Sequence, residues 1–288
     1  MSASRPAAAG VAVVTDSTAY LSPGLADRYG VTEVPLHVVL GDRTGAEGLE
    51  VSPGDVASAL HERRMKVSTS RPTPAEFVAR YRSLGVPDIV SVHLSAELSG
   101  TWEAAALAAE QVRGDGIAVR VVDSRMLAMG LGFAVIAAAQ AAADGADAAA
   151  VEQAAVRQAA ATDMIFYVDT LEHLRRGGRI GAAAALLGTA LSVKPLLHVT
   201  DGKIAPLEKV RTVAKAVARL EDLAVQRAGS GPVDVAVHHL EAPDRAALLG
   251  ERLCARLPAL VDLHVSEVGA VVGAHVGPGL LGVVVSRR

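Results

Sequence analysis

The chain has 288 residues, of which 51% are hydrophobic, 20% are charged and 3% are aromatic. This composition argues against disorder and predicts a packed protein long enough for two domains. The formal net charge of −3 and the few aromatic rings argue against a nucleic-acid-binding protein, because such proteins use basic surfaces and stacking platforms.

Cysteine usage and the N-terminus favour a soluble, cytoplasmic protein. Cys254 is the only cysteine, which excludes an intramolecular disulfide, and no Cys or His pair has the spacing of a structural zinc site. Residues 1–10 lack the apolar core of a signal peptide. Residues 126–143 are mostly Ala and Gly and contain Gln140, so we expect a buried helix there and no membrane insertion.

Short apolar runs that end in polar loops recur in the first half of the chain. These runs and their loops are residues 11–14 with Thr15-Asp16-Ser17-Thr18, residues 88–94 with Ser95 and Ser99-Gly100-Thr101, and residues 119–122 with Asp123-Ser124. A helix is predicted from Ser22-Pro23, a strand over residues 34–40 and a helix over residues 102–112. Alternating strands and helices predict a mostly parallel sheet, and ligands bind such sheets beyond the carboxyl ends of the strands.

Composition changes after the Ala-rich residues 137–161, and we place a domain boundary near Asp163, between residues 1–163 and 164–288. Asp201-Gly202 predicts a hairpin turn between the apolar residues 186–199 and a strand that starts at Lys203. The predicted elements that follow are helices over 212–228 and 243–257 and strands over 233–238, 263–268 and 282–285. We expect an α+β layer with a mixed sheet.

The segment Leu174-Arg175-Arg176-Gly177-Gly178-Arg179-Ile180 places three arginines around two glycines, just after the extended residues 166–169. Arginine offers a fork of donors that fits a carboxylate or a phosphate, and glycine lets the backbone approach a ligand closely. A solvated cluster at the surface is the alternative interpretation.

Residues 277–282 match the literal dinucleotide fingerprint, but only six residues follow them, so no βαβ unit can be completed. The chain also has no Walker A sequence, and Ser99 lacks the upstream glycine of a nucleophile elbow. His275 precedes the glycine loop and is either a general base, a donor to an anion, or a histidine satisfied by local backbone.

The hydroxyl-rich loops, residues 68–74 and 99–101, could simply cap the helices that follow them. Capping does not explain why several such loops gather at one edge of a sheet without a metal cluster or an acid–base pair. Neutral donors with a nearby His or Arg suit a site that holds a carboxylate or phosphate, and the small aliphatic residues could surround an apolar tail.

Motifs along the whole chain resemble the DegV family of bacterial fatty-acid-binding proteins. They are Val14-Thr15-Asp16-Ser17-Thr18, Thr69-Ser70-Arg71-Pro72-Thr73, Leu98-Ser99-Gly100-Thr101, Asp123-Ser124, residues 174–180, Lys194-Pro195, Asp201-Gly202-Lys203, Lys209-Val210-Arg211-Thr212 and His275-Val276-Gly277-Pro278-Gly279. The resemblance implies a DegV-like α/β fold of two domains, the first a three-layer α/β/α domain with a parallel sheet and the second a two-layer α/β domain with a mixed sheet.

The resemblance also implies a function: a long-chain fatty acid binds in an apolar tunnel between the domains, and no other cofactor is needed. A separate ATP-dependent fatty acid kinase would phosphorylate the bound acid for lipid synthesis, so this chain would be a carrier and not an enzyme. The implied ligand-binding residues are Thr69, Ser70, Ser95, Ser99, Gly100, His275 and Gly277, and the implied partner or transfer residues are Arg179 and Arg211.

The sequence departs from the family pattern at two places. Arg71 stands where Gln is usual and could add a charge near the pocket entrance, and Ser95-Ala96-Glu97 lacks a frequent second serine, which leaves open whether Ser95 or Ser99 is the direct donor. Two other functions are also open. One is a hydrolase or transferase that uses Ser99 and His275, and the other is a regulator that senses lipid supply.

Overall fold

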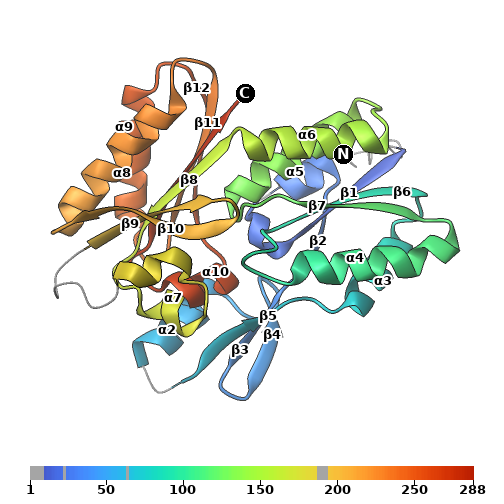
Figure 1. The fold of residues 1–288 in the computed structure, drawn as a ribbon, viewed down its shortest axis with the longest axis horizontal. Helices are drawn as coiled ribbons and strands as arrows, with labels where there is room; N and C mark the ends of the chain where they lie inside the picture. Colours follow the sequence, from blue (N-terminus) through green and yellow to red (C-terminus); the bar gives the residue numbers. More distant parts are fainter. Residues whose placement is uncertain (1–9, 22–23, 63–64, 187–193) are drawn as a thin grey trace, which may run out of the picture.

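The computed structural model describes residues 10–21, 24–62, 65–186 and 194–288, within which the strands form three sheets (Figure 1). The strands are β1 (Val11–Asp16), β2 (Thr32–Val34), β3 (His37–Leu40), β4 (Arg43–Ala46), β5 (Val67–Ser70), β6 (Asp88–His93), β7 (Ala118–Asp123), β8 (Thr162–Tyr167), β9 (Lys194–Thr200), β10 (Lys203–Val210), β11 (Val233–His239), β12 (Leu260–Glu267) and β13 (Leu281–Arg287). The α-helices are α1 (Leu25–Tyr29), α2 (Pro53–Glu62), α3 (Pro74–Ser83), α4 (Thr101–Val112), α5 (Met129–Ala143), α6 (Ala148–Ala160), α7 (Glu172–Arg176), α8 (Val213–Ala228), α9 (Pro243–Arg256) and α10 (Ala270–Val276).

The N-terminal sheet has the order β2-β1-β6-β7 and is parallel throughout, as the sequence predicts. Helices α3 and α4 cover one face, where Phe77, Tyr81 and Ile89 are fully buried. Helices α5 and α6 cover the other face. Both faces are therefore buried, which explains why these strands read as continuous apolar runs and not as alternating ones.

The C-terminal sheet has the order β10-β9-β8-β13-β11-β12 and is mixed, since β11 and β12 are parallel and the other neighbours are antiparallel. Helices α8 and α9 pack on one face through small and branched side chains. The other face packs toward α5 and α6, so these helices lie between the two large sheets (Figure 1). The predicted α/β fold with a parallel and a mixed sheet is confirmed.

Helix α5 is buried along most of its length, as predicted for the Ala-rich stretch. Glycines and alanines occupy much of its surface, so it can approach both neighbouring sheets closely. Among the described residues, no helix combines the length and apolarity that crossing a membrane requires.

The prediction of a single strand over residues 34–40 is wrong. Strand β2 ends at Val34 and β3 begins at His37, and the two strands belong to different sheets. Pro35 lies between them, and proline has no N–H to continue a ladder. The chain therefore leaves the parallel sheet and enters a small antiparallel sheet of order β4-β3-β5, which the sequence did not predict.

Other expected boundaries move by a few residues or cannot be assessed. The expected helix start at Ser22-Pro23 lies outside the described residues, and so do residues 187–193 of the apolar stretch before β9. The expected hairpin is confirmed, with positive φ at both Asp201 and Gly202. The expected domain boundary near Asp163 falls within β8, and the division into two domains stays a prediction.

Segments from both halves of the chain share the core of the small sheet. Leu36, Val38 and Val56 from the first half pack against Val271 and Ala274 on α10 from the second half. Figure 1 shows the small sheet with α2, α7 and α10 gathered at one end of the molecule. We call this group of elements the closing module.

Glu47 ties the start of α10 to the first half of the chain. Its side chain is buried, and its carboxylate accepts hydrogen bonds from the backbone N–H of Val271 (2.7 Å), the hydroxyl of Tyr20 (3.1 Å) and the hydroxyl of Ser17. Burial raises the pKa of the Glu47 carboxyl group, while these three donors partly offset that effect. A buried acceptor with three donors stabilises the packing of distant segments against each other.

Replacing Glu47 with alanine should leave these three donors without their acceptor. We expect the E47A change to lower the free energy of unfolding by about 2–4 kcal/mol, measured by urea denaturation. Glu50 is exposed on the same connection and is the matched control, for which E50A should cost less than about 1 kcal/mol. Equal losses in both variants would show that Glu47 does not join the two halves.

Candidate functional site

A cavity lies where the closing module meets the two large sheets, with a volume of about 570 Å³ that includes the part open to solvent. We call it the mouth cavity. Its polar lining residues are Thr69, Ser70, Arg71, Ser99, Arg179 and His275. The remaining lining residues are aliphatic and come from α7, β10 and α10, from the loops that follow β6 and β7, and from Leu36 just before β3.

A second cavity, with a volume of about 350 Å³ that also includes open solvent, adjoins the mouth cavity. We call it the inner cavity. The two cavities share Leu127, Ile204, Val272 and Val276, and the inner end is lined by Met164, Phe166, Val268, Leu280, Gly282 and His238. Together they make a path that is polar at one end and almost entirely apolar at the other.

His275 and Thr69 meet at the polar end. The Nε2 atom of His275 lies 2.8 Å from the Thr69 hydroxyl, while Nδ1 is buried and has no hydrogen-bond partner among the described residues. Burial, and to a lesser degree the charge of Arg179, lower the pKa of His275 to about 4. The imidazole is therefore neutral at pH 7, and Nε2 is the nitrogen that lies on the side of Thr69.

Gly177 allows this arrangement, because a Cβ atom at that position would collide with Nδ1 of His275. His173 packs in a similar way against Gly277, whose φ is +75°. Gly277 itself is buried and shapes the turn after α10, and the mouth cavity lining does not include it. The two glycines thus let α7 and α10 approach each other closely.

The three arginines of the sequence motif have different environments. Arg175 and Arg176 are exposed, and both pair with Glu172 on α7. For these two arginines the alternative interpretation, a solvated cluster at the surface, is therefore the right one. Arg179 is half-buried, and it donates from Nε to the carbonyl of Leu98 (3.0 Å) and from Nη1 to that of Gly177 (2.6 Å). No acidic side chain in the described part of the chain pairs with Arg179, so its charge faces the cavity uncompensated.

The structure separates the two candidate serines. Ser99 lines the mouth cavity, and its hydroxyl lies 2.9 Å from that of Thr101. Ser95 donates instead to the carbonyl of Gly202 (2.7 Å) in the β9–β10 hairpin. Helix α4 has Gly100 at its N-cap without a side-chain capping bond, so capping does not account for Ser99.

Thr69 and Ser70 end strand β5, and the capping role falls to Thr73, which forms a capping box with Glu76. Arg71 follows β5 and lines the mouth cavity, but its guanidinium donates to the carbonyl of Gly100 and pairs with Glu103. Its charge is therefore balanced within the protein. Arg211 is exposed at the junction of β10 and α8, away from the lining of both cavities.

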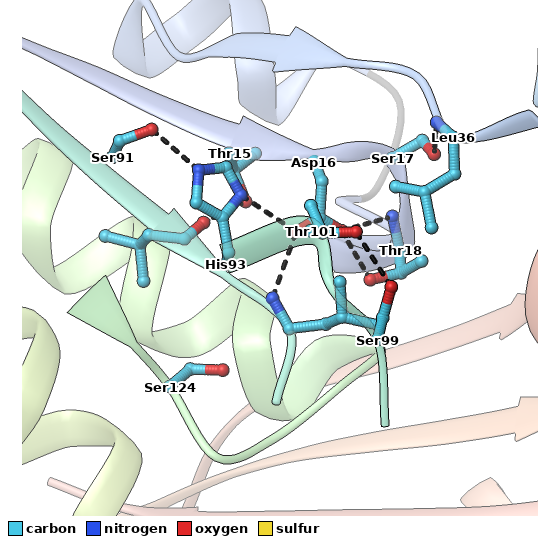
Figure 2. Close-up of polar contacts among 12 residues, drawn as sticks. Thr15, Asp16, Ser17, Thr18, Leu36, Ser91, His93, Ser99, Thr101 and Ser124 are labelled. Atoms are coloured by element: carbon cyan, nitrogen blue, oxygen red, sulfur yellow. Dashed lines mark hydrogen bonds and ion pairs between the residues drawn. The ribbon is translucent and has the colours of Figure 1, made fainter. Parts of the chain in front are cut away.

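A buried polar network at the carboxyl ends of β1 and β6 holds the loop that carries Ser99 (Figure 2). Asp16 accepts hydrogen bonds from the backbone N–H of Leu94 (3.0 Å) and from Nδ1 of His93 (3.0 Å), and its other oxygen accepts from Thr18. The far nitrogen of His93 lies 2.7 Å from the Ser91 hydroxyl. These donors satisfy an acid that is fully buried.

Ser91, His93 and Asp16 are connected like the triad of a serine hydrolase, but all three are fully buried and line neither the mouth cavity nor the inner cavity. Tyr81 donates to the Ser91 hydroxyl (2.9 Å), which fills the position a substrate would need. We therefore assign the network a structural role. Across the described ranges, no group of three or more His, Cys, Asp or Glu side chains could hold a metal ion.

His238 is the polar side chain at the inner end, and sequence reasoning did not identify it. Its Nε2 accepts a hydrogen bond from the backbone N–H of Met129 (3.1 Å), so Nδ1 carries the proton and faces the Ser266 hydroxyl (3.2 Å). Burial lowers its pKa to about 4. The inner end is therefore uncharged at pH 7. Only the apolar strand around His238 could have drawn attention to it.

Comparison with known proteins gives a consistent picture across the chain. A family model for uncharacterised proteins of the DegV family matches residues 10–288. A DegV domain-containing protein of Streptomyces coelicolor is 59% identical over 281 residues, which cover 96% of this chain and 99% of that protein.

Two solved structures are similar over the same extent. A fatty-acid-binding DegV family protein of Thermus thermophilus matches with a TM-score of 0.91 and 32% identity, covering 96% of this chain and 99% of that one. DegV of Bacillus subtilis, a fatty acid binding protein, matches with a TM-score of 0.89 and 34% identity, again covering 96% of this chain and 99% of that one.

The lowered pKa of His238 predicts a pH-dependent stability. Between pH 6.5 and about 4 the unfolded chain binds a proton at this histidine and the folded chain does not, so this contribution to stability is lost as the pH falls. The free-energy difference between the wild type and H238Q should change by up to about 1.4 kcal/mol per pH unit in this window and stay constant above it. Urea denaturation at several pH values measures the free energy of unfolding of both proteins. If it changes with pH in the same way in the wild type and in H238Q, the lowered pKa of His238 is contradicted.

Proposed function

This chain belongs to the DegV family, and we propose that it binds a long-chain fatty acid in the joined mouth and inner cavities and presents the carboxylate to a separate ATP-dependent kinase. The observation that carries the proposal is the path from a polar mouth to an apolar inner end. Binding of fatty acids by the T. thermophilus and B. subtilis proteins, which share this fold, supports it.

The energetics of the path suit an acyl chain. Each methylene buried against the aliphatic walls contributes about 0.8 kcal/mol, so a long tail has ample affinity. Moving a carboxylate from water into a protein is unfavourable unless hydrogen-bond donors surround it. The polar groups therefore have to gather at one end, which is the arrangement around Thr69, Ser99 and His275.

We place the carboxylate among the Thr69, Ser70 and Ser99 hydroxyls and the Nε2 atom of His275, beside the backbone of Gly100. The neutral imidazole donates a hydrogen bond when its proton is on the nitrogen that faces the ligand. Arg179 supplies a positive charge, and its two known hydrogen bonds to backbone carbonyls leave further N–H groups free to bind an anion. Ser95, whose hydroxyl is engaged by Gly202, is the less suitable donor.

In the proposed function the chain is a carrier and the kinase is the catalyst. A carboxylate oxygen bonds to the γ-phosphorus of ATP as the bond to the β–γ bridging oxygen breaks, which gives an acyl phosphate and ADP. The kinase partner and the roles of Arg179 and Arg211 in docking or transfer rest on the family resemblance. The exposure of Arg211 is compatible with a partner contact. We also propose that the protein acts in the cytoplasm, in lipid synthesis.

The hydrolase alternative gains no support from the geometry. A serine nucleophile needs a base within hydrogen-bond reach, yet the Ser99 hydroxyl contacts Thr101 and the accessible partner of His275 is Thr69. Within the described residues no acidic side chain orients the imidazole of His275.

The direct test is organic extraction of the purified protein, with mass spectrometry of the extract and of the intact protein. We expect one fatty acid per chain, because the cavities form a single path with one polar end. Protein stripped of lipid should rebind a long-chain fatty acid with the same stoichiometry. A protein that carries no lipid and takes up none would overturn the proposal.

Replacing Thr69 with valine removes the hydroxyl and keeps the shape of the side chain. The loss of one buried donor should weaken fatty acid binding by about 1–3 kcal/mol, roughly 5- to 150-fold in Kd. Thr44 is exposed on β4 of the same small sheet, and T44V is the matched control with unchanged affinity. Thermal unfolding of both variants confirms that they are folded, and equal affinities for T69V and wild type would remove Thr69 from the site.

A further inference from the structure

The serine that lines the mouth cavity, Ser99, lies between two carbonyl groups that accept hydrogen bonds from arginines. The carbonyl of Leu98, which precedes it, accepts from Nε of Arg179 (3.0 Å). The carbonyl of Gly100, which follows it, accepts from Nη1 of Arg71 (3.1 Å). Both arginines line the mouth cavity, one after α7 and the other after β5. The segment that carries Ser99 is therefore held from two sides.

Arg71 connects the two groups of hydroxyls at the mouth cavity. It directly follows Thr69 and Ser70 at the end of β5, and its guanidinium lies so close to Gly100 that a Cβ atom there would collide with it. Pro72 comes next, and a residue before proline is restricted to extended backbone, which limits the directions in which the Arg71 side chain can leave β5. One side chain thus spans from the hydroxyls of β5 to the start of α4.

Glu103 anchors the far end of this bridge. Its carboxylate accepts from the same Nη1 atom of Arg71 (2.5 Å), and it lies in the first turn of α4, close to Gly100. The side chains of Arg71 and Glu103 are 44% and 63% exposed, and an ion pair with this exposure contributes little to the stability of a whole fold. We therefore expect the effect of the pair to be local.

The placement of donors matters for binding an anion. Thr69 and Ser70 belong to the small sheet, whereas Ser99 follows β6 of the parallel sheet, so the distance between the two groups of hydroxyls depends on contacts across the cavity. The hydrogen bond from Arg71 to Gly100 is such a contact. A shift of about 1 Å takes a hydroxyl out of the range of a good hydrogen bond.

We propose that Arg71 is a positioning residue of the carboxylate site, which holds the Ser99 segment at a fixed distance from the end of β5 so that the hydroxyls of both reach one carboxylate. This inference rests on the proposed function, since it requires the carboxylate to lie at the mouth cavity. Arg71 acts through Ser99 and not by direct contact with the ligand, because its Nη1 atom is engaged by Gly100 and Glu103.

The test compares palmitate with 1-hexadecanol, which has a tail of the same length and a neutral head. Both ligands are delivered from cyclodextrin, and binding is measured by displacement of a fluorescent fatty acid. Replacing Arg71 with alanine should weaken palmitate binding about five-fold and leave hexadecanol within about two-fold, because the charged head depends more strongly on well-placed donors. Equal losses for both ligands, or no loss for palmitate, would overturn the inference.

Arg82 provides the matched control. It is an exposed arginine on α3 that pairs with Asp115 (2.8 Å), just after α4, and it lines neither the mouth cavity nor the inner cavity. The R82A variant should bind both ligands as the wild type does. A loss of palmitate affinity in R82A equal to that in R71A would show that any exposed ion pair next to α4 has the same effect, against the inference.

A double-mutant cycle with Ser99 separates positioning from direct contact. If Arg71 acts through the Ser99 hydroxyl, S99A and the double variant R71A/S99A should bind palmitate with the same affinity within about two-fold. Losses that add in the double variant would contradict a role through Ser99, and so would unchanged palmitate binding in S99A.

Replacing Glu103 with alanine gives opposite results for a direct contact and for positioning. A direct contact between Arg71 and the ligand would become stronger without the competing carboxylate, so palmitate would bind more tightly. Positioning predicts binding weaker by about two-fold, because Arg71 loses its anchor on α4. Tighter or unchanged palmitate binding in E103A therefore rejects the inference and leaves the proposed function intact. Failure of the wild type to bind palmitate rejects both.

Discussion

The hydrogen bond between Thr69 and His275 joins residues that are 206 positions apart in the chain. It forms only when α10 packs against the small sheet, because Thr69 ends β5 and His275 lies in the last turn of α10. Glu47 fixes the first turn of the same helix. The polar end of the cavity is therefore set by how the closing module fits together, and not by any one local motif.

The cavity itself follows from the layered architecture. Its walls come in part from the loop before α5, from β10 and from α10, which belong to three separately packed parts of the fold. Where such layers meet, small aliphatic residues leave space that a chain with more aromatic rings would fill. The low aromatic content, noted first as an argument against nucleic acid binding, therefore also bears on the existence of an apolar path.

Much of the fold could be predicted because its strands and helices carry strong local patterns. The parallel strands read as apolar runs that end in polar loops, and the family resemblance is confirmed by the comparisons. The small sheet escaped prediction because β4 exposes Arg43 and Thr44, so it shows no alternating pattern. Helix α10 escaped because it is short and apolar except for His275, and such a helix takes its shape from its neighbours.

Individual site residues were harder to predict than elements. Sequence alone could not tell whether Ser95 or Ser99 binds the ligand, because both serines lie in the loop after β6. The structure distinguishes them, since the hydroxyl of Ser95 donates to the carbonyl of Gly202. The three arginines of one motif likewise divide into two surface ion pairs and one half-buried cation, according to where the chain turns after α7. These differences depend on contacts between remote segments, which a local pattern does not contain.

The shared core of the small sheet has a consequence for how the protein is made. Residues 36–59 are synthesised well before the apolar side chains that cover them, which come from Ala270 to Ala274. Until then Leu36, Val38 and Val56 lack their packing partners, and such uncovered surface favours aggregation. This part of the molecule can therefore reach its native state only after α10 has been synthesised, and the same holds for any ligand path that α10 lines.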